Sequence, residues 1–198
     1  NEHFKRSDNQ APKNADPGEP GEEFSLRLEL KLIAEVGIVG KPNAGKSTLL
    51  AALTKATPRI ANYPFTTLSP QLGVAEVDGS RRIILADIPG LIEGASEGAG
   101  LGHEFLRHIE RTRMIVHLVD LRPEDESDPA ENYEVVRGEL RGYSEELADK
   151  PELIVVNKAD LFEDEKSLKD AINAFCRRLD LRRKDVHVVS GAARLGGG

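Results

Sequence analysis

A short stretch that begins at Gly40 contains the residue types that bind a polyphosphate. It fits the pattern G-x-x-x-x-G-K-[ST], and it consists of Gly40, Lys41, Pro42, Asn43, Ala44, Gly45, Lys46, Ser47 and Thr48. Glycine lets backbone amides approach a phosphate closely, and the N-terminus of a following helix favours negative charge. We therefore predict that this stretch binds phosphates, that Lys46 reaches the terminal ones and that Ser47 binds Mg²⁺. The alternative is an ordinary glycine turn after a strand.

A second motif, Asp87-Ile88-Pro89-Gly90, follows the strand expected at 82–86. A carboxylate at the end of a strand can hold Mg²⁺ through its water shell, and the backbone amide of Gly90 can then meet the terminal phosphate. We predict that Asp87, Ile88, Pro89 and Gly90 all lie at the nucleotide. The alternative is a simple strand-to-turn sequence, which is common.

The residues Asn157-Lys158-Ala159-Asp160 follow the apolar run at 153–156 and fit the recognition of a guanine base. Asp160 can accept hydrogen bonds from the ring N–H and the exocyclic amine, Asn157 can bond the other edge of the ring, and the Lys158 stem can lie across it. Adenine lacks both donors, so it would leave Asp160 unpaired, at a cost of about 1.5–3 kcal/mol for each lost bond. The alternative is that Asp160 caps a helix.

Two weaker signals fit the same ligand. A backbone amide of Ser190-Gly191-Ala192, just after the last expected strand, could bond the guanine carbonyl oxygen; otherwise these small residues form a turn. The long loop at 56–70 contains Thr66-Thr67, where a hydroxyl can complete the magnesium shell and a backbone N–H can reach the terminal phosphate. Such a loop would order with a triphosphate and relax with a diphosphate. The alternative is that both threonines serve a turn.

The elements that must position these motifs alternate between strand and helix. Alternation of leucine with charged residues predicts a strand at 26–32, and largely apolar segments predict strands at 36–39, 72–77, 82–86, 114–119, 153–156 and 186–189. Helical patterns follow at 49–55, 103–113, 130–149 and 164–179. This order predicts an α/β fold with a mainly parallel sheet, and Asp78-Gly79 predicts a hairpin that gives one antiparallel edge strand. A final covering helix is expected after 189, so we expect the domain to be truncated before it.

Composition narrows the class of protein. The chain has 198 residues, a formal net charge of −7 and a single cysteine, Cys176. The charge argues against a surface that grips nucleic acid everywhere, and one cysteine excludes an internal disulfide framework and favours a reducing cytoplasm. No apolar run approaches a membrane span and no signal peptide is visible. Residues 1–23 are rich in Pro, Gly, Asn and charge, which predicts an irregular tail.

Together these motifs resemble those of a translation-factor-class P-loop GTPase and, more narrowly, the Obg (CgtA) family of ribosome-assembly GTPases. The loop sequences at 62–68, 87–95 and 98–107 carry the resemblance. It implies the three-layer sandwich of P-loop NTPases over 31–198, with 1–30 as the C-terminal remnant of the glycine-rich Obg domain and a linker. It also implies that Phe65, Thr66 and Thr67 lie at the nucleotide, with Thr67 as the switch threonine and a magnesium ligand.

The resemblance implies an enzyme that slowly hydrolyses GTP to GDP and phosphate with Mg²⁺. Such a protein acts as a switch in large ribosomal subunit assembly and is linked to growth control, the stringent response and guanosine tetraphosphate. Its expected partners are the large subunit and ribosomal RNA, reached through the switch loops and through domains that this chain lacks. We expect a cytoplasmic monomer.

The chain departs from the usual GTPase pattern after Gly90. Many GTPases place a water-orienting glutamine there, whereas this chain has Leu91, which cannot orient water. We therefore assign catalysis to Lys46, Thr67, Gly90 and Asn43. In related GTPases an asparagine at the position of Asn43 helps to hold K⁺, which could replace an arginine finger, a part worth about 10³–10⁵ in rate. Gly191 stands where the family usually has alanine, and we expect a minor effect.

Other functions stay open. The absent glutamine fits a guanine-nucleotide sensor whose hydrolysis is incidental. A P-loop kinase would need an acceptor site and a basic lid, and the motif at 157–160 argues against it. A neighbouring GTPase family with related switch loops is the third alternative. Basic residues at 177–184 could contact RNA, although a solvated face is the simpler interpretation. The acidic run at 120–128 matches no calcium loop, and we interpret it as solvated.

Overall fold

The computed structural model of this chain describes residues 7, 10, 18, 20–25, 34–54, 58–60, 71–87, 110, 112–191 and 195–197. The chain divides into two compact units, Asn1–Leu30 and Lys31–Gly198. In the first unit, residues 20–25 form neither helix nor strand, and Phe24 is 75 % exposed. All the helices and strands that the structure describes belong to the second unit.

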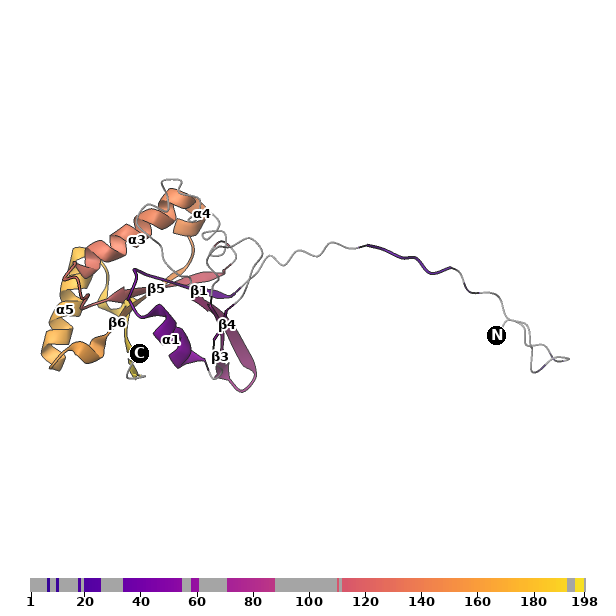
Figure 1. Ribbon diagram of the computed structural model, residues 1–198, viewed down its shortest axis with the longest axis horizontal. Helices are drawn as coiled ribbons and strands as arrows, with labels where there is room; N and C mark the ends of the chain where they lie inside the picture. Colours follow the sequence, from indigo (N-terminus) through magenta and orange to yellow (C-terminus); the bar gives the residue numbers. More distant parts are fainter. Residues whose placement is uncertain are drawn as a thin grey trace. The chain divides into compact units, whose positions relative to one another are not determined.

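The described strands of the second unit form one eight-stranded sheet in the order β2-β3-β4-β1-β5-β6-β7-β8 (Figure 1). Their bounds are β1 Val36–Val39, β2 Arg59–Ile60, β3 Gln71–Asp78, β4 Arg81–Asp87, β5 Met114–Asp120, β6 Glu152–Asn157, β7 Val186–Ser190 and β8 Leu195–Gly197. The pairs β4–β1, β1–β5, β5–β6 and β6–β7 are parallel. Because parallel strands end at the same edge, the residues that follow these five strands lie along one end of the sheet, where α/β proteins bind ligands.

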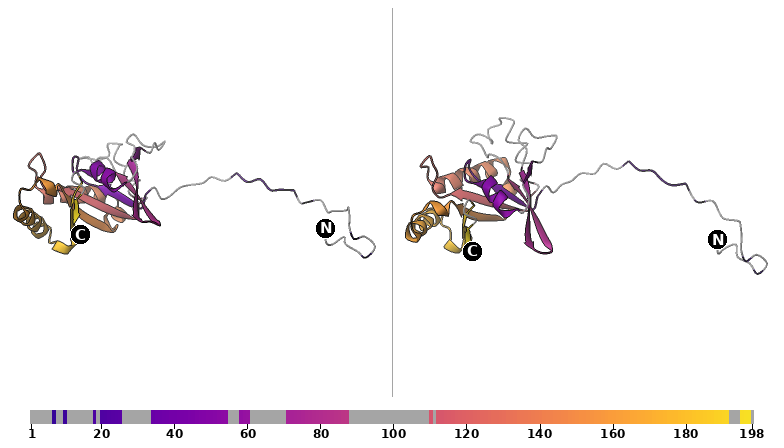
Figure 2. Two further views of the ribbon diagram at one scale, coloured as in Figure 1. Left: turned by 90° about the horizontal axis from the view of Figure 1, so that it is seen from below. Right: turned by 60° about the horizontal axis from the view of Figure 1, so that its bottom comes forward.

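Helices cover both faces of the sheet, which gives three layers (Figures 1 and 2). On one face lies α1 (Lys46–Leu53), whose Leu49 and Leu50 pack with Ile38 of β1 and Leu118 of β5. The other face carries α3 (Pro129–Tyr143), α4 (Glu145–Ala148) and α5 (Glu165–Arg178). Their apolar residues join two further buried clusters, one around β1 and one around β6. The α/β, three-layer P-loop architecture that the sequence predicts is confirmed.

The structure corrects several details of the sequence prediction. The hairpin at Asp78-Gly79 is present, but the described strands form three antiparallel pairs, because β2 pairs with β3 and β8 pairs with β7 in addition to β3 with β4. Both extra strands are too short to leave an alternating pattern. The helix expected over 130–149 is broken at Ser144, whose backbone is extended and whose hydroxyl accepts a hydrogen bond from Leu147 N as the N-cap of α4. The strand expected at 26–32 and the helix expected at 103–113 lie almost wholly outside the described residues.

The start of α3 is stabilised by Asp128. Its Oδ1 accepts hydrogen bonds from the backbone nitrogens of Ala130 (2.8 Å) and Glu131 (3.1 Å), and its Oδ2 pairs with Arg178 of α5 at 2.8 Å. We expect Asp128→Ala to lower the free energy of unfolding by about 1–2 kcal/mol in urea denaturation, because helix donors lose their acceptor. Asp128→Asn keeps the capping oxygen and should lose less than half of that; equal losses would show that the ion pair, rather than the cap, matters.

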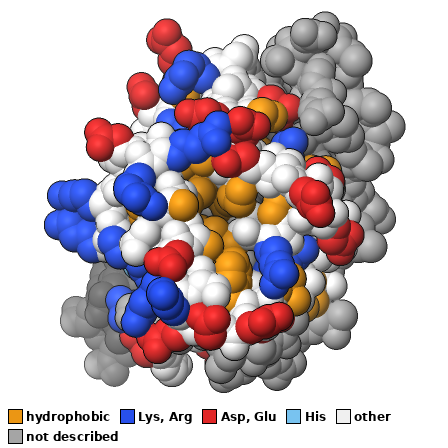
Figure 3. Space-filling model, turned by 90° about the vertical axis from the view of Figure 1, so that its left-hand side faces the viewer, with side chains coloured by type: hydrophobic (Ala, Val, Ile, Leu, Met, Phe, Trp, Pro, Cys, Tyr) orange, Lys and Arg blue, Asp and Glu red, His pale blue; other side chains and the backbone are white. Residues whose placement is uncertain are grey.

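Two of the five basic residues at 177–184 form ion pairs. Arg178 pairs with Asp128 and with Glu131 (2.6 Å), and Arg182 pairs with Asp185 (2.7 Å). On the α5 side of the molecule, Lys and Arg side chains alternate with Asp and Glu (Figure 3). This mixed face supports the simpler interpretation of the cluster, a solvated surface, over an RNA-binding patch.

Candidate functional site

The glycine-rich stretch connects the end of β1 to the start of α1, which is the strand–loop–helix context that the motif requires. Gly40 has φ +153°, and a Cβ there would collide with the backbone oxygen of Leu118 in β5. Gly45 has φ +93°, and a Cβ there would collide with the side-chain Nδ2 of Asn157. Both glycines therefore let the loop pass closer to the neighbouring strands than any side chain would allow.

The remaining loop residues differ in exposure. Ala44 is buried and Lys41 half-buried, while Pro42, Asn43 and Thr48 are exposed. Asn43 has φ +62°, in the left-handed region that asparagine tolerates better than most residues. The exposed loop residues can therefore approach a ligand while Ala44 fixes the loop to the core.

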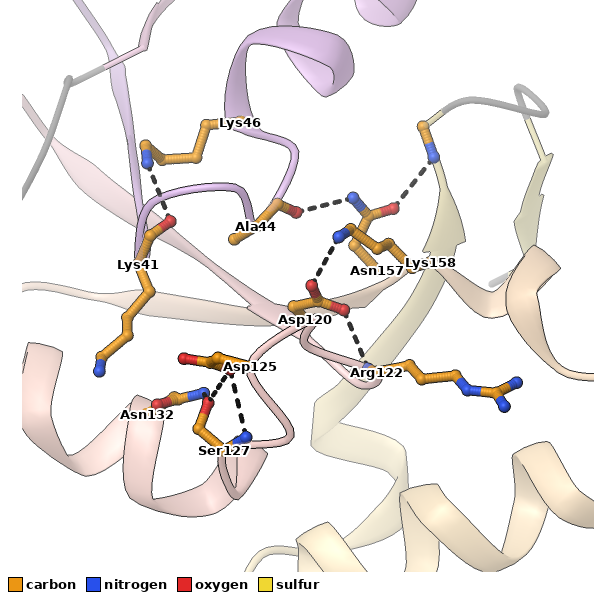
Figure 4. Close-up of polar contacts among 11 residues, drawn as sticks. Lys41, Ala44, Lys46, Asp120, Arg122, Asp125, Ser127, Asn132, Asn157 and Lys158 are labelled. Atoms are coloured by element: carbon orange, nitrogen blue, oxygen red, sulfur yellow. Dashed lines mark hydrogen bonds and ion pairs between the residues drawn. The ribbon is translucent and has the colours of Figure 1, made fainter.

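The side chain of Lys46 is buried and folds back onto the phosphate loop. Lys46 is 8 % exposed, and its ammonium donates a hydrogen bond of 3.0 Å to the carbonyl oxygen of Gly40. It donates a second, of 3.2 Å, to the carbonyl oxygen of Lys41 (Figure 4). Burial lowers the pKa of this amine, and the negative charge of Asp87 opposes that shift. An ammonium bound only by neutral carbonyls gains from exchanging them for an anionic oxygen, because charge-assisted hydrogen bonds are stronger. The geometry thus suits transfer of Lys46 to a phosphate.

Ser47, near the start of α1, and Asp87, the last residue of β4, are in contact, as the magnesium prediction requires. The Ser47 hydroxyl donates a hydrogen bond to Asp87 Oδ2. Asp87 is 3 % exposed, and its buried Oδ1 accepts no hydrogen bond from any residue that the structure describes. A buried acceptor without a donor is costly, and Mg²⁺ takes oxygen ligands while keeping several waters. The two side chains therefore fit a magnesium ion, and the roles expected for them, Ser47 as a direct ligand and Asp87 acting through water, stay predictions.

Protein side chains alone do not form a metal cage here. Within the described residues, no group of three or more His, Cys, Asp or Glu could hold a metal ion. Magnesium is usually bound by one or two side chains together with phosphates of the substrate. The pair Ser47 and Asp87 matches that mode of binding.

Asn157, the last residue of β6, joins the two halves of the site. It is 3 % exposed; its Nδ2 donates to the carbonyl oxygen of Ala44 (2.9 Å), and its Oδ1 accepts from the backbone nitrogen of Gly191 (3.0 Å) (Figure 4). Sequence reasoning assigned Asn157 to the base and missed this connection, which spans residues far apart in the chain. Nδ2 carries a second hydrogen, which is available to donate to a base. Contact between Asn157 and the base stays a prediction.

Asp160 lies next to the loop that follows β7. Lys158 has φ +62° and turns the chain from β6 into the 3₁₀ segment η3 (Ala159–Leu161), which leaves Asp160 exposed. The Ser190 hydroxyl donates a hydrogen bond to Asp160 Oδ1. Each carboxylate oxygen can accept more than one hydrogen bond, so the oriented carboxylate can still accept two N–H groups of a base. The helix-cap alternative is wrong, because Asp160 lies within η3 and Asp164 caps α5.

Seven predicted site residues lie outside the described part of the chain. They are Phe65, Thr66, Thr67, Ile88, Pro89, Gly90 and Ala192. Their roles at the nucleotide, including the switch function of Thr67, stay predictions.

A pocket of about 390 Å³ lies on the α3 side of the phosphate loop, and the sequence did not reveal it. Residues 41–44 of the loop and side chains of β5 and α3 line it, whereas none of Asn157–Asp160 does. Its lining includes the buried His117, whose Nδ1 lies 2.8 Å from Glu152 Oε1 and whose ring stacks on Tyr133. Burial lowers the pKa of His117, so its neutral ring donates to the Glu152 carboxylate. This pair is a structural support beneath the pocket.

Comparisons with known proteins identify the family of this chain. Residues 35–158 match a family model described as 50S ribosome-binding GTPase. The "GTPase Obg" of Persephonella marina is 54 % identical over 178 residues, which cover 90 % of this chain and 52 % of that protein. The "GTPase Obg" of Magnetococcus marinus is 50 % identical over 192 residues, which cover 97 % of this chain and 49 % of that protein. The chain thus spans about half the length of the curated relatives it matches.

Two solved structures support the fold. Era of Aquifex aeolicus bound to GDP·AlF4− has a TM-score of 0.56 at 24 % identity, covering 81 % of this chain and 52 % of that one. A structure of Era with MgGDPNP and nucleotides 1506–1542 of 16S ribosomal RNA has a TM-score of 0.56 at 25 % identity, covering 80 % and 51 %. Because the family model matches more than half of the chain, this protein belongs to the 50S ribosome-binding GTPase family.

Proposed function

We propose that this chain binds GTP with Mg²⁺ and hydrolyses it slowly to GDP and phosphate. The observation that carries this proposal is a pair of hydrogen bonds at the Asn157 side chain, which donates to the carbonyl oxygen of Ala44 and accepts from the backbone nitrogen of Gly191. These bonds bring the phosphate loop and the guanine-reading segment to the same end of the sheet. One nucleotide can therefore contact Lys46 through its phosphates and Asp160 through its base.

Different residues of the chain would bind the phosphates, the base and the metal ion. Lys46 leaves the loop carbonyls for the terminal phosphates, and Asp160, oriented by Ser190, accepts hydrogen bonds from guanine. Ser47 and Asp87 hold Mg²⁺, which neutralises charge on the phosphates when bound. The predicted contributions of Thr67 and Gly90 complete the terminal-phosphate site.

Turnover by the isolated chain separates an enzyme from a sensor. With saturating GTP and Mg²⁺, we expect phosphate release above the background of the Lys46→Met variant. Tight GTP binding without such turnover would instead favour the alternative function, a guanine-nucleotide sensor, for which partner docking is the output.

Asn43 supports a role for K⁺ in catalysis. Asn43 is an exposed residue of the phosphate loop, and leucine rather than glutamine follows Gly90. We expect turnover to rise at least about tenfold when K⁺ replaces Na⁺, since a bound cation can supply charge stabilisation like an arginine finger. Asn43→Gly removes the side chain but tolerates φ +62°, and it should abolish most of this difference. Equal rates in both salts would exclude K⁺.

We further propose that hydrolysis serves assembly of the large ribosomal subunit, with the subunit and its RNA as partners and guanosine tetraphosphate as a regulatory ligand. The family description, which names 50S ribosome binding, supports this choice of subunit. Residues 1–30 would be the end of an Obg domain and its linker, and the protein a cytoplasmic monomer. No helix among the described residues is long and apolar enough to cross a membrane. Co-sedimentation of the GTP-loaded full-length protein with large subunits tests this role.

A further inference from the structure

The end of β5 lies directly beside the guanine-reading segment. In the parallel pair β5–β6, Asp120 is in register with Asn157, the residue before Lys158. Asp120 Oδ2 lies 2.7 Å from Lys158 Nζ, and Asp120 Oδ1 accepts a hydrogen bond of 2.9 Å from the backbone nitrogen of Arg122 (Figure 4). Each oxygen of this carboxylate therefore has its own partner, which fixes its orientation.

This ion pair is shielded from solvent. The side chains of Asp120 and Lys158 are 10 % and 21 % exposed. The sequence interpretation of 120–128 as a solvated loop is therefore wrong for Asp120. Screening by water and salt is weaker for such a pair than for one on the open surface, so Lys158 loses rotational freedom that it would otherwise keep.

The same loop after β5 also holds the far end of η3. Arg122 donates a hydrogen bond of 2.6 Å to the carbonyl oxygen of Leu161, and its guanidinium lies 6.0 Å from the centre of the Phe162 ring. Asp120 thus acts on the side chain of Lys158, while Arg122 acts on the backbone that follows Asp160. The two residues have separable effects.

We propose that Asp120 is a positioning residue for nucleotide recognition, which holds the Lys158 side chain in place to lie across the purine. The inference rests on the proposed function, because it needs a guanine nucleotide at this site. Asp120 itself does not contact the base. A preset Lys158 gives up less conformational entropy when the nucleotide binds, which raises affinity without altering which base is read.

The test is a double-mutant cycle on equilibrium GDP affinity with Mg²⁺. Asp120→Asn keeps an oxygen for the Arg122 amide but removes the charge that attracts Lys158, and we expect it to weaken GDP binding about tenfold, the effect of one charge-assisted contact. In a Lys158→Met background, the same change should alter affinity less than about twofold. Asp185→Asn, which breaks an exposed ion pair with Arg182 far from the motif, is the matched control and should bind GDP normally.

Inosine diphosphate distinguishes positioning of Lys158 from general support of the loop. It lacks the exocyclic amine that Asp160 reads, so the ratio of GDP to IDP affinity reports on Asp160 alone. We expect Asp120→Asn to weaken both ligands equally and to keep that ratio. Three results would each overturn the proposal. They are loss of the preference for GDP over IDP in Asp120→Asn, a full tenfold loss of GDP affinity from the same change in the Lys158→Met background, and unchanged GDP affinity in Asp120→Asn. Failure of the unaltered chain to bind GDP would instead overturn the proposed function itself.

Discussion

Asp160→Asn is expected to lower GTP affinity by at least about a hundredfold, because a charged acceptor for two guanine donors becomes a neutral amide. The amide can donate to the extra carbonyl of xanthine, so the same variant should bind XTP better than GTP. The hydrogen bond from Ser190 supports this expectation, since it holds the reading carboxylate in one orientation. Competition of GTP and XTP against a fluorescent nucleotide measures both effects.

The matched control is Asp170→Asn, which changes an exposed aspartate on α5. It should leave the preference for GTP over XTP unchanged. If Asp160→Asn kept full GTP affinity, Asp160 would not read the base, and the guanine motif would be only a turn.

Gly45→Ala is expected to reduce nucleotide affinity by at least about a hundredfold and to lower the free energy of unfolding by about 1–3 kcal/mol. Alanine would be strained at the backbone angle of residue 45, φ +93°. Its methyl group would also collide with Asn157 Nδ2. Asn157 cannot easily move aside, because its buried amide is hydrogen-bonded on both sides, to Ala44 and to Gly191. Calorimetric titration with GDP and urea denaturation give the two quantities.

Two other glycines serve as controls for this prediction. A Cβ on Gly191 would make ordinary contacts, the nearest at 3.5 Å to Leu49 N, so Gly191→Ala should bind GDP normally although Gly191 bonds Asn157. Gly138 in α3 has open space around it, and Gly138→Ala should stabilise the helix by about 1 kcal/mol. If Gly45→Ala behaved like either control, the close packing of the loop against Asn157 would not matter for binding.

The predictable parts of the site are those written in consecutive residues. The phosphate loop and the guanine motif each follow an apolar strand, and parallel strands place such residues at one edge of the sheet without further information. The α/β fold follows from the same alternation. The short strands β2 and β8 were not predictable, because their pairing with neighbouring strands defines them. The break between α3 and α4 was not predicted either; Ser144 separates the two helices and caps α4 with its hydroxyl.

The unpredicted contacts depend on residues distant in sequence. Asn157 binds Ala44 of the phosphate loop, and Asp120 at the end of β5 binds Lys158 just after β6. The sequence does not specify which strands are neighbours or their register, so these contacts could not be predicted. The same holds for Gly45, whose need for glycine comes from Asn157 as well as from its backbone angle. The acidic run at 120–128 therefore looked solvated, although its first member, Asp120, is half-buried and paired with Lys158.

Equilibrium binding of GDP and ADP to the unaltered chain, with Mg²⁺ and then with excess EDTA, tests the central claim most directly. The described geometry predicts a preference for GDP over ADP of at least about a hundredfold, since adenine leaves Asp160 unpaired. It also predicts weaker GDP binding in EDTA, because Ser47 and Asp87 then have no metal to share with the phosphates. Equal affinity for GDP and ADP, or no binding of either, would contradict the account.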